Sequence, residues 1–324
     1  MEYAFLGDTD LEVSRICFGT WAYGGDWGTY DRDDALAAIR RARGMGINFF
    51  DTAQAYGFGT AEEVLGEALR DEIAHRRGEI VIATKGGLRM DDGELERDAG
   101  RDWLRRGIEE SLEHLGTDHV DLYQVHWPDP DTPARETAAA LEEFVDEGLT
   151  RHVGVSNYGV EEMEAHREHG ELDSLQPPYH MFRRAIEDEV LPYCRENGIG
   201  VLVYGPLAHG LLTGKYTPDE EFPADDWRSG SDVFRGRAFR RNLGVVDRLE
   251  ELAGRKDGSV AQLAVAWTLS HPAVDCAIVG ARNPEQIEET ARSVDVELEP
   301  ADLQEIERIL EDAAPVGGPT PEGV

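Results

Sequence analysis

The feature that most constrains the fold is a regular alternation of short β-rich runs with amphipathic helical stretches along 324 residues. Strands are predicted near 14–21, 47–53, 79–85, 120–127, 151–157, 172–177, 200–207 and 275–280. Helices are predicted over 33–44, 61–73, 101–115, 134–147, 160–169, 187–197 and 259–271. In residues 134–147, for example, Ala138, Leu141 and Val145 recur at helical spacing. Eight strands alternating with helices predict an α/β fold, a (β/α)8 TIM barrel in one domain over residues 1–324.

The main alternative is a doubly wound open sheet, which usually carries a G-x-G-x-x-G fingerprint after its first strand. Here the first strand leads into GTWAYGGDWGTY, which lacks that spacing, so the barrel is favoured. Residues 1–12 are expected to form a hairpin that closes the barrel floor, and 213–240 a long loop after strand seven. The tail over about 313–324 is rich in Gly and Pro and is expected to be flexible.

The charge argues against several classes of partner. A net charge of −34 disfavours binding to nucleic acid or to anionic membranes. Only three lysines, at 85, 215 and 256, stand among the 32 basic residues, against 66 acidic ones. This composition resembles that of proteins from salt-accumulating halophiles, in which dense surface carboxylates keep a protein hydrated. An acidic protein from a non-saline source is the alternative.

The N-terminus and the cysteines favour a cytoplasmic location. MEYAFLGDTDLEV lacks the basic and apolar regions of a signal peptide, and no apolar run approaches the ~18–20 residues of a membrane span. Cys17, Cys194 and Cys276 stand far apart, so neither a disulfide framework nor a metal site is indicated. We expect a cytoplasmic protein, and its oligomeric state stays open.

Polar residues interrupt or end the apolar strand runs at the same end of each strand. Asp51 ends the second strand, with Tyr56 just after it, Lys85 ends the third strand and His126 the fourth. The later strands continue the pattern with Ser156, Asn157, Gln176, Tyr204 and Arg282. Because active sites of such barrels lie at the C-terminal ends of the strands, the pattern predicts a polar pocket at one mouth.

Asp51, Tyr56, Lys85 and His126 form a set that suits proton transfer to a carbonyl oxygen. A tyrosine with a pKa near 10 is a poor proton donor at neutral pH. An ammonium about 4 Å away would stabilise the phenolate by up to roughly 4 kcal/mol at an effective dielectric of 20, and so lower that pKa. Asp51 would keep Lys85 charged, while His126 would orient the carbonyl. Arginine is a poor substitute at position 85, because its planar fork is larger and spreads the charge.

At these residues the chain resembles the aldo-keto reductase superfamily, and the likeness covers nearly its whole length. The matching stretches are FGTW (18–21), NFFDTAQAYG (48–57), ATKGG (83–87), DLYQVHWPD (121–129), GVSNY (154–158), LQPPYH (175–180), YGPLAHGLLTGKY (204–216) and VGARNPEQIEE (279–289). The resemblance implies a barrel that uses NAD(P)H without a Rossmann domain and reduces the carbonyl of a small aldehyde or ketone to an alcohol. It implies Tyr56 as general acid, supported by Lys85 and Asp51, with His126 aiding carbonyl orientation.

The resemblance also implies where the cofactor lies. Ser156, Asn157 and Gln176 would meet the nicotinamide carboxamide, and Tyr204 would stack on the nicotinamide ring. The other implied contacts are Thr20, Trp21 and Asp51 near the reactive end, Gly205, Leu207, Leu212 and Lys215 at the pyrophosphate, and Gly280, Arg282, Gln286 and Glu289 at the adenosine. Because a guanidinium binds phosphate bidentately, Arg282 favours NADP(H).

Four points stay open. The chain has Gly205, Gly280-Ala281 and Thr290 where many relatives have Ser, Lys-Ser and Asn, so NAD(H) stays possible. A non-catalytic, nucleotide-sensing subunit resembling the potassium-channel β-subunits would keep the same motifs. A metal-dependent hydrolase would use Asp51 and His126 as ligands, which a buried Lys85 disfavours. Trp21, Trp127 and Phe58 are candidates for the walls of a substrate pocket or for plain packing.

Overall fold

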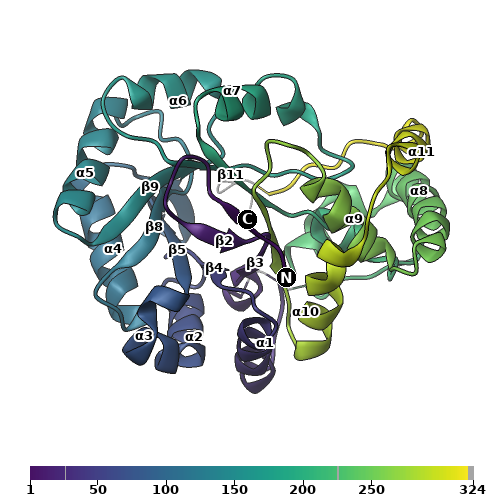
Figure 1. Ribbon diagram of the computed structural model, residues 1–324, viewed down its shortest axis with the longest axis horizontal. Helices are drawn as coiled ribbons and strands as arrows, with labels where there is room; N and C mark the ends of the chain where they lie inside the picture. Colours follow the sequence, from purple (N-terminus) through teal and green to yellow (C-terminus); the bar gives the residue numbers. More distant parts are fainter. Residues whose placement is uncertain (26, 225, 320–324) are drawn as a thin grey trace.

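A closed barrel of eight parallel strands forms the centre of the protein (Figure 1). The computed structural model describes residues 1–324 except 26, 225 and 320–324. The barrel strands in chain order are β3 (Ile16–Gly19), β4 (Phe49–Asp51), β5 (Val81–Gly86), β8 (Val120–Val125), β9 (Thr150–Ser156), β10 (Ser174–Gln176), β11 (Gly200–Tyr204) and β12 (Cys276–Gly280). Pairing of β12 with β3 closes the barrel. The predicted (β/α)8 fold is confirmed, and each predicted strand overlaps one of these eight.

Helices surround the barrel on its outside (Figure 1). They are α1 (Arg32–Gly44), α2 (Thr60–Ala68), α3 (Arg70–His75), α4 (Arg101–Leu115), α5 (Ala134–Asp146), α6 (Val160–Arg167), α7 (Val190–Glu196), α8 (Gly236–Arg255), α9 (Val260–Leu269), α10 (Pro284–Ala291) and α11 (Pro300–Leu310). The predicted helix 61–73 is divided at Leu69 into α2 and α3. None of the helices in the described part of the chain is long and apolar enough to cross a bilayer.

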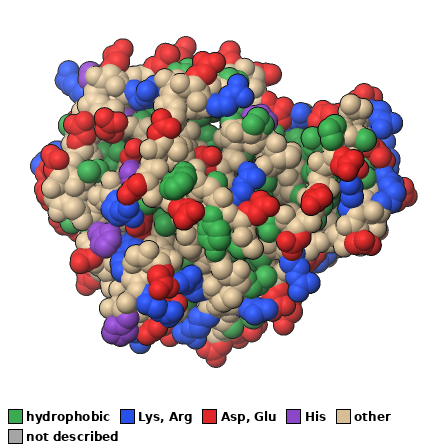
Figure 2. All heavy atoms as spheres, in the orientation of Figure 1, with side chains coloured by type: hydrophobic (Ala, Val, Ile, Leu, Met, Phe, Trp, Pro, Cys, Tyr) green, Lys and Arg blue, Asp and Glu red, His purple; other side chains and the backbone are tan. Residues whose placement is uncertain are grey.

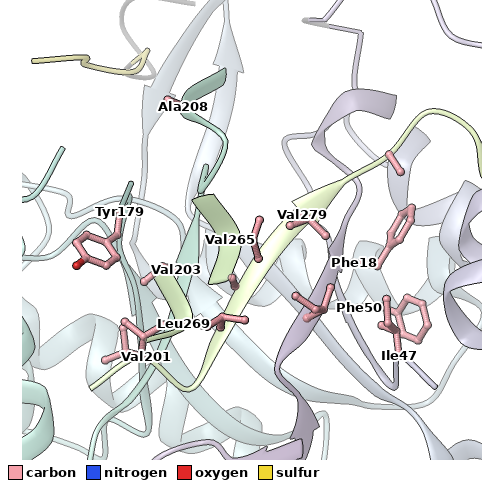
Figure 3. Packing of buried hydrophobic residues seen from close by; sticks show 14 of the residues in the cluster. Phe18, Ile47, Phe50, Tyr179, Val201, Val203, Ala208, Val265, Leu269 and Val279 are labelled. Atoms are coloured by element: carbon pink, nitrogen blue, oxygen red, sulfur yellow. The ribbon is translucent and has the colours of Figure 1, made fainter. Parts of the chain in front are cut away.

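The period-two alternation of the strands decides which side chains face the barrel axis. Cys17, Phe49 and Leu122 point inward and pack with Leu6, Leu11 and other apolar residues. Residues of the opposite parity face the helices. Figure 3 shows Phe18, Phe50 and Val279 on this outer side, where they join the apolar layer that also contains Val265 and Leu269 of α9. The inward parity continues to the C-terminal ends of the strands, where it reaches polar residues.

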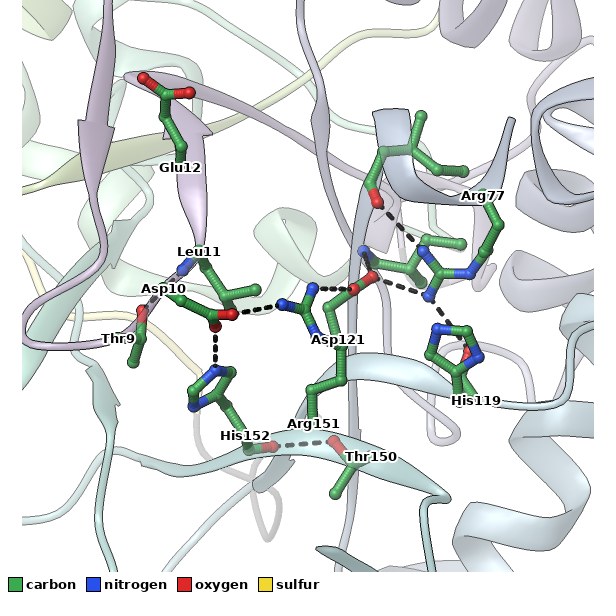
Figure 4. A network of polar contacts seen from close by, with 12 residues as sticks. Thr9, Asp10, Leu11, Glu12, Arg77, His119, Asp121, Thr150, Arg151 and His152 are labelled. Atoms are coloured by element: carbon green, nitrogen blue, oxygen red, sulfur yellow. Dashed lines mark hydrogen bonds and ion pairs between the residues drawn. The ribbon is translucent and has the colours of Figure 1, made fainter.

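The expected N-terminal hairpin is present as β1 (Tyr3–Phe5) paired with β2 (Glu12–Ser14). In its loop Leu6 and Leu11 are buried against the interior of the barrel, so the hairpin closes the floor. Figure 4 shows how charges fix it: Asp10 binds both Arg151 and His152, and Arg151 continues to Asp121. These contacts tie the hairpin to β8 and β9.

A second hairpin, which the sequence analysis did not predict, follows β5. It consists of β6 (Leu88–Asp91) and β7 (Glu94–Arg97), paired antiparallel. Asp92 and Gly93 form its two-residue turn with φ angles of 46° and 89°. Positive φ at both positions is the signature of a type I′ turn, for which Asp-Gly is a preferred pair. The Asp-Gly pair was therefore a usable signal.

The expected loop 213–240 is shorter than predicted, because α8 begins at Gly236. It contains the 3-10 turns η5 (Trp227–Gly230) and η6 (Asp232–Phe234), and η4 (Ala208–Thr213) precedes it. The chain end, expected to be flexible from about 313, packs on the protein in its described part: Ala314 exchanges two hydrogen bonds with Asn242, and Val316 is buried. Residues 320–324 lie outside the described residues.

Candidate active site

Lys85 occupies the centre of the polar layer and is completely buried. Its Nζ atom donates to Asp51 Oδ2 at 2.7 Å and to the carbonyl oxygen of Thr52 at 2.8 Å. A third, longer contact of 3.4 Å reaches the Tyr56 hydroxyl. Lys85 points inward because it follows Val81 and Ala83 at the same parity of β5. The three donors of one ammonium thus join β4, β5 and the loop after β4.

Asp51 uses its second carboxylate oxygen as well. Its Oδ1 accepts from Gln176 Nε2 at 2.8 Å, across the barrel from β10. Burial raises the pKa of Asp51, and the charge of Lys85 together with hydrogen bonds from Lys85, Gln176 and Gln124 opposes that rise. A buried ammonium thus has a matched and hydrogen-bonded counter-charge, which limits the desolvation penalty of the pair. The Lys85 cation beside Oδ2 also disfavours a metal ion at this carboxylate, which the hydrolase alternative requires.

Tyr56 is fixed by the backbone of its loop. Its N–H donates to the Ala53 carbonyl at 3.1 Å, and its own carbonyl accepts from Ala61 at 3.2 Å. Gly24 packs so closely on this turn that an added Cβ would lie 2.9 Å from the Tyr56 Cα. The Tyr56 ring is stacked on Trp21, with ring centroids 6.3 Å apart. The loop therefore presents the hydroxyl at one position beside Lys85.

His126 lies next to the same hydroxyl, with its ring centroid 5.6 Å from that of Tyr56. Burial, and then the charge of Lys85, hold the pKa of His126 well below its usual value, so the imidazole is neutral at pH 7. Its Nδ1 atom is buried and has no hydrogen-bond partner in the described part of the chain. A proton on Nδ1 would be a buried, unsatisfied donor, which favours the tautomer with the proton on Nε2. The ring can then donate into the cavity.

Polar side chains from β9, β10 and β11 complete the layer. Asn157 donates to the His126 carbonyl at 3.0 Å and accepts from the Tyr204 hydroxyl at 2.8 Å. Ser156 donates to the Gln176 carbonyl at 2.8 Å. Asn157 adopts φ 64°, a left-handed conformation that asparagine tolerates better than most residues. The predicted ring of polar groups at one mouth of the barrel is therefore present.

A cavity of about 420 Å³ opens above this layer. The predicted site residues that line it are Trp21, Asp51, Tyr56, His126, Ser156, Asn157, Gln176, Tyr204, Gly205, Leu207, Lys215, Gly280, Arg282, Gln286 and Glu289. Thr20, Lys85 and Leu212 are fully buried beneath the surface instead. Thr20 lies under the polar layer, donating to the Asp51 carbonyl, and Leu212 belongs to the apolar core. Trp127 lines the cavity as expected for a wall residue, whereas Phe58 is exposed.

The end of the cavity near α10 gathers positive charge. Arg282 donates its guanidinium to the Trp27 carbonyl, and burial, reinforced by Arg228, lowers its pKa. Arg228 is itself paired with Asp226 and donates to Tyr216 Oη at 2.5 Å. Lys215 is largely exposed, 3.9 Å from Glu289. These three cations can serve anionic groups of a bound molecule.

Two loops meet over this end of the cavity, and their contact was not predicted from the sequence. Trp27 and Asp226 form an isolated antiparallel bridge between the loop after β3 and the loop after β11. Arg228 lies over the Trp27 ring, 4.7 Å from its centroid, and His209 lies beside both segments. Loop residues carry no periodic signal, and their pairing depends on segments far apart in the chain. The one usable signal was the tryptophans, whose large side chains are costly to expose and therefore indicate that these loops pack on the protein.

The residues present fit a dinucleotide. Gly205 lines the cavity, and a Cβ added there would meet no atom within 4 Å, so the glycine leaves open room beside Tyr204. The cationic end supplies phosphate partners, and the opposite end supplies amide and hydroxyl groups. Within the described residues, no group of His, Cys, Asp and Glu is arranged to hold a metal ion.

The comparisons with known proteins agree with this geometry. The family model described as "Aldo/keto reductase family" matches residues 15–311. The aldo-keto reductase YhdN of Bacillus subtilis is 43% identical over 98% of this chain and 96% of its own length. The solved structure of a glycerol dehydrogenase from Gluconobacter oxydans superposes with a TM-score of 0.88 at 37% identity, covering 98% of each chain.

Two further relatives differ in the function that their names state. The NADH-specific methylglyoxal reductase of Escherichia coli is 34% identical over 94% of this chain and 98% of its own. A probable voltage-gated potassium channel subunit beta of Arabidopsis thaliana is 36% identical over 96% of this chain and 97% of its own. Both span the whole barrel.

Proposed function

The chain belongs to the aldo/keto reductase family, and on that premise we propose that it reduces aldehyde and ketone carbonyls to alcohols with NADP(H), using Tyr56 as general acid. The family and its named reductases make the chain an oxidoreductase of carbonyl compounds. The observation that carries the proposal is the position of Lys85 Nζ, 2.7 Å from Asp51 and 3.4 Å from the Tyr56 hydroxyl.

In the proposed reaction Tyr56 gives its hydroxyl proton to the carbonyl oxygen. The ammonium of Lys85 stabilises the phenolate that remains, and Asp51 keeps the ammonium charged. Neutral His126 donates from Nε2 to the same carbonyl oxygen and so orients it. The nicotinamide, when bound, supplies the hydride that the carbonyl carbon receives. The product is an alcohol, and the Tyr56 phenolate is reprotonated from solvent.

The lining residues support a cofactor arrangement. Ser156, Asn157 and Gln176 would hold the nicotinamide carboxamide, and Tyr204 the ring. The proposed pyrophosphate contacts are Gly205, Leu207 and Lys215, and the proposed adenosine contacts are Gly280, Arg282, Gln286 and Glu289. Leu212, expected as a further pyrophosphate contact, is buried in the apolar core and is not among the lining residues. Arg282 supports NADP(H), since a guanidinium suits a phosphate. NAD(H) is the alternative cofactor, because one relative is named as NADH-specific.

A second function is favoured by one finding, the potassium-channel β-subunit relative that matches 96% of the chain. Such a subunit would bind nucleotide through the same cavity without sustained turnover. The four residues Asp51, Tyr56, Lys85 and His126 fit both functions, because Asp51, Tyr56 and His126 also line the cavity and Lys85 binds Asp51 beneath it.

The loss of 340 nm absorbance with NADPH and a panel of aldehydes and ketones separates these functions. Turnover that falls at least ~100-fold in Tyr56→Phe, with NADPH affinity retained, supports the reductase. NADPH binding without turnover of any carbonyl supports the sensor. Turnover that a chelator abolishes and NADPH does not affect would instead favour the hydrolase.

We also propose that the chain acts as a single domain in the cytoplasm, with no nucleic-acid or membrane partner, and that its acidic surface adapts it to salt. Figure 2 shows acidic side chains spread over the visible face, with basic ones among them. The net charge of −34 supports this proposal.

A further inference from the structure

The second hairpin places two leucines in the cavity. Leu88 and Leu95 both line it, and β6–β7 pairing sets Met90 opposite Leu95 and Arg97 opposite Leu88. Directly opposed residues share a face of the hairpin, so all four side chains lie on one face. Leu88 is buried at the base of this face, whereas Met90 is 52% exposed near the turn. The face thus runs from the cavity to solvent.

Hydrogen bonds hold the second hairpin against the neighbouring parts of the chain. Trp103 Nε1 donates to the Leu88 carbonyl at 3.1 Å, and Asp98 donates to the Gly87 carbonyl at 3.0 Å. Arg97 donates to the Pro128 carbonyl at 3.0 Å, and its guanidinium lies 5.1 Å from the Trp127 ring centroid. The leucines and Trp127 are therefore coupled to the segments that directly follow β5, which carries Lys85, and β8, which His126 follows.

Further apolar side chains line the cavity beside Tyr56. These are Trp21, Ala22 and Ala55. The charged side chains that line the cavity, among the described residues, are Asp51, Lys215, Arg228, Arg282 and Glu289. Asp51 is neutralised by Lys85, and the other four come from the segments after β11 and β12, on the proposed cofactor side. Arg97 shares the hairpin face but is not among the lining residues, because its guanidinium is engaged with the Pro128 carbonyl and the Trp127 ring.

We propose that Leu88, Leu95, Trp21 and Trp127 form an apolar substrate compartment, and that Leu95 is a specificity-determining residue which selects uncharged, apolar aldehydes. The inference rests on the proposed reductase function. An alkyl or aryl group gains free energy when it leaves water for this wall. A carboxylate or phosphate on the substrate loses its hydration there and meets leucine and indole side chains in place of a counter-charge.

An isosteric pair of substrates tests the class. 4-Methylpentanal and 4-oxobutanoate have nearly the same shape, but the second carries a carboxylate in place of an isopropyl group. With the NADPH-loaded enzyme we expect kcat/KM for 4-methylpentanal to be at least ~100-fold higher. Along straight-chain aldehydes from propanal to hexanal, kcat/KM should rise up to about fourfold per methylene while the chain extends along the wall.

A matched pair of variants tests Leu95. Leu95→Ala should lower kcat/KM for hexanal about tenfold and leave propanal within about twofold, because only the longer chain reaches the hairpin. Met90→Ala, the same kind of truncation at the opposed but exposed position, should change neither value. Leu95→Lys should lower the ratio of kcat/KM for 4-methylpentanal to kcat/KM for 4-oxobutanoate at least tenfold. Melting temperatures of the variants within a few degrees of the parent show that folding is preserved.

The outcomes separate this inference from the proposed function. Equal kcat/KM for the two isosteric substrates, or equal losses in Leu95→Ala and Met90→Ala, would overturn the apolar compartment while leaving a reductase. Reduction of none of these aldehydes would overturn both.

Discussion

The Nζ atom of Lys85 lies 3.4 Å from the Tyr56 hydroxyl oxygen and 2.7 Å from Asp51 Oδ2, in a site with no solvent exposure at the lysine. Two neighbouring barrel strands and the loop between them create this geometry. A charge buried so completely is costly unless each of its donors has an acceptor, and here all three do. This explains why a chain with only three lysines retains one at this position.

Lys85→Arg keeps the positive charge but should nevertheless lower both the stability and the activity of the protein. A guanidinium is larger than an ammonium and does not fit between Asp51, Thr52 and Tyr56, so the free energy of unfolding should fall by about 1–3 kcal/mol. The rate of carbonyl reduction should fall at least ~100-fold. Lys256→Arg is the matched control, since Lys256 pairs with Asp302 at 2.5 Å on the surface. Denaturant unfolding and steady-state kinetics of both variants give the comparison; equal effects would contradict the account.

Arg282 provides a test of cofactor preference. If it meets the 2′-phosphate, Arg282→Leu should weaken NADPH binding about tenfold or more and leave NADH binding within about twofold. The ratio of the two dissociation constants, measured by cofactor fluorescence, cancels general damage to the cavity. Equal weakening of both cofactors would assign Arg282 a structural role through its contact with Trp27.

His152 makes the stability of the barrel floor depend on pH. Its side chain contacts Asp173 at 3.3 Å and Asp10 at 2.7 Å, and the pKa of His152 is raised mainly by the Asp173 contact, while partial burial opposes the rise. A raised folded-state pKa means that the charged form favours folding. This stabilisation is complete below the unfolded pKa near 6.5 and is lost as pH rises through the folded value.

His152→Gln should accordingly lower the melting temperature by roughly 2 °C or more near pH 6 and have little effect near pH 9. His75→Gln, at an exposed site on α3, serves as the control at both pH values. A loss for His152→Gln that is the same at pH 6 and pH 9 would argue that the contacts with Asp10 and Asp173 do not depend on protonation.

Salt should stabilise the folded protein. With 66 acidic and 32 basic residues, the compact state carries strong self-repulsion, which ions screen over about 10 Å at 0.1 M and about 3 Å at 1 M. The melting temperature should rise between 0.1 and 2 M KCl. If the melting temperature does not change, the acidic composition does not reflect adaptation to salt, and that proposal is wrong.

Much of the fold and of the polar layer at the barrel mouth could be predicted because both follow from local periodicity. The parity of Asp51, Lys85 and Gln176 along short strands fixes their inward direction, and the barrel then brings their ends together. The meeting of Trp27 with Asp226 could not be predicted, because it joins two irregular loops whose paths depend on packing. Thr20 and Leu212 show a related limit: sequence motifs identify a neighbourhood, whereas exposure to the cavity depends on exact side-chain packing.

A double-mutant cycle on Tyr56 and Lys85 tests most directly whether the ammonium of Lys85 acts through the Tyr56 hydroxyl. Tyr56→Phe and Lys85→Met should each lower kcat/KM for an aldehyde by roughly 10²–10⁴-fold, with NADPH binding retained. Because the ammonium acts through the hydroxyl, the double variant should be no slower than Tyr56→Phe alone. Losses that multiply in the double variant would show that the two residues act independently, and would contradict the proposed acid.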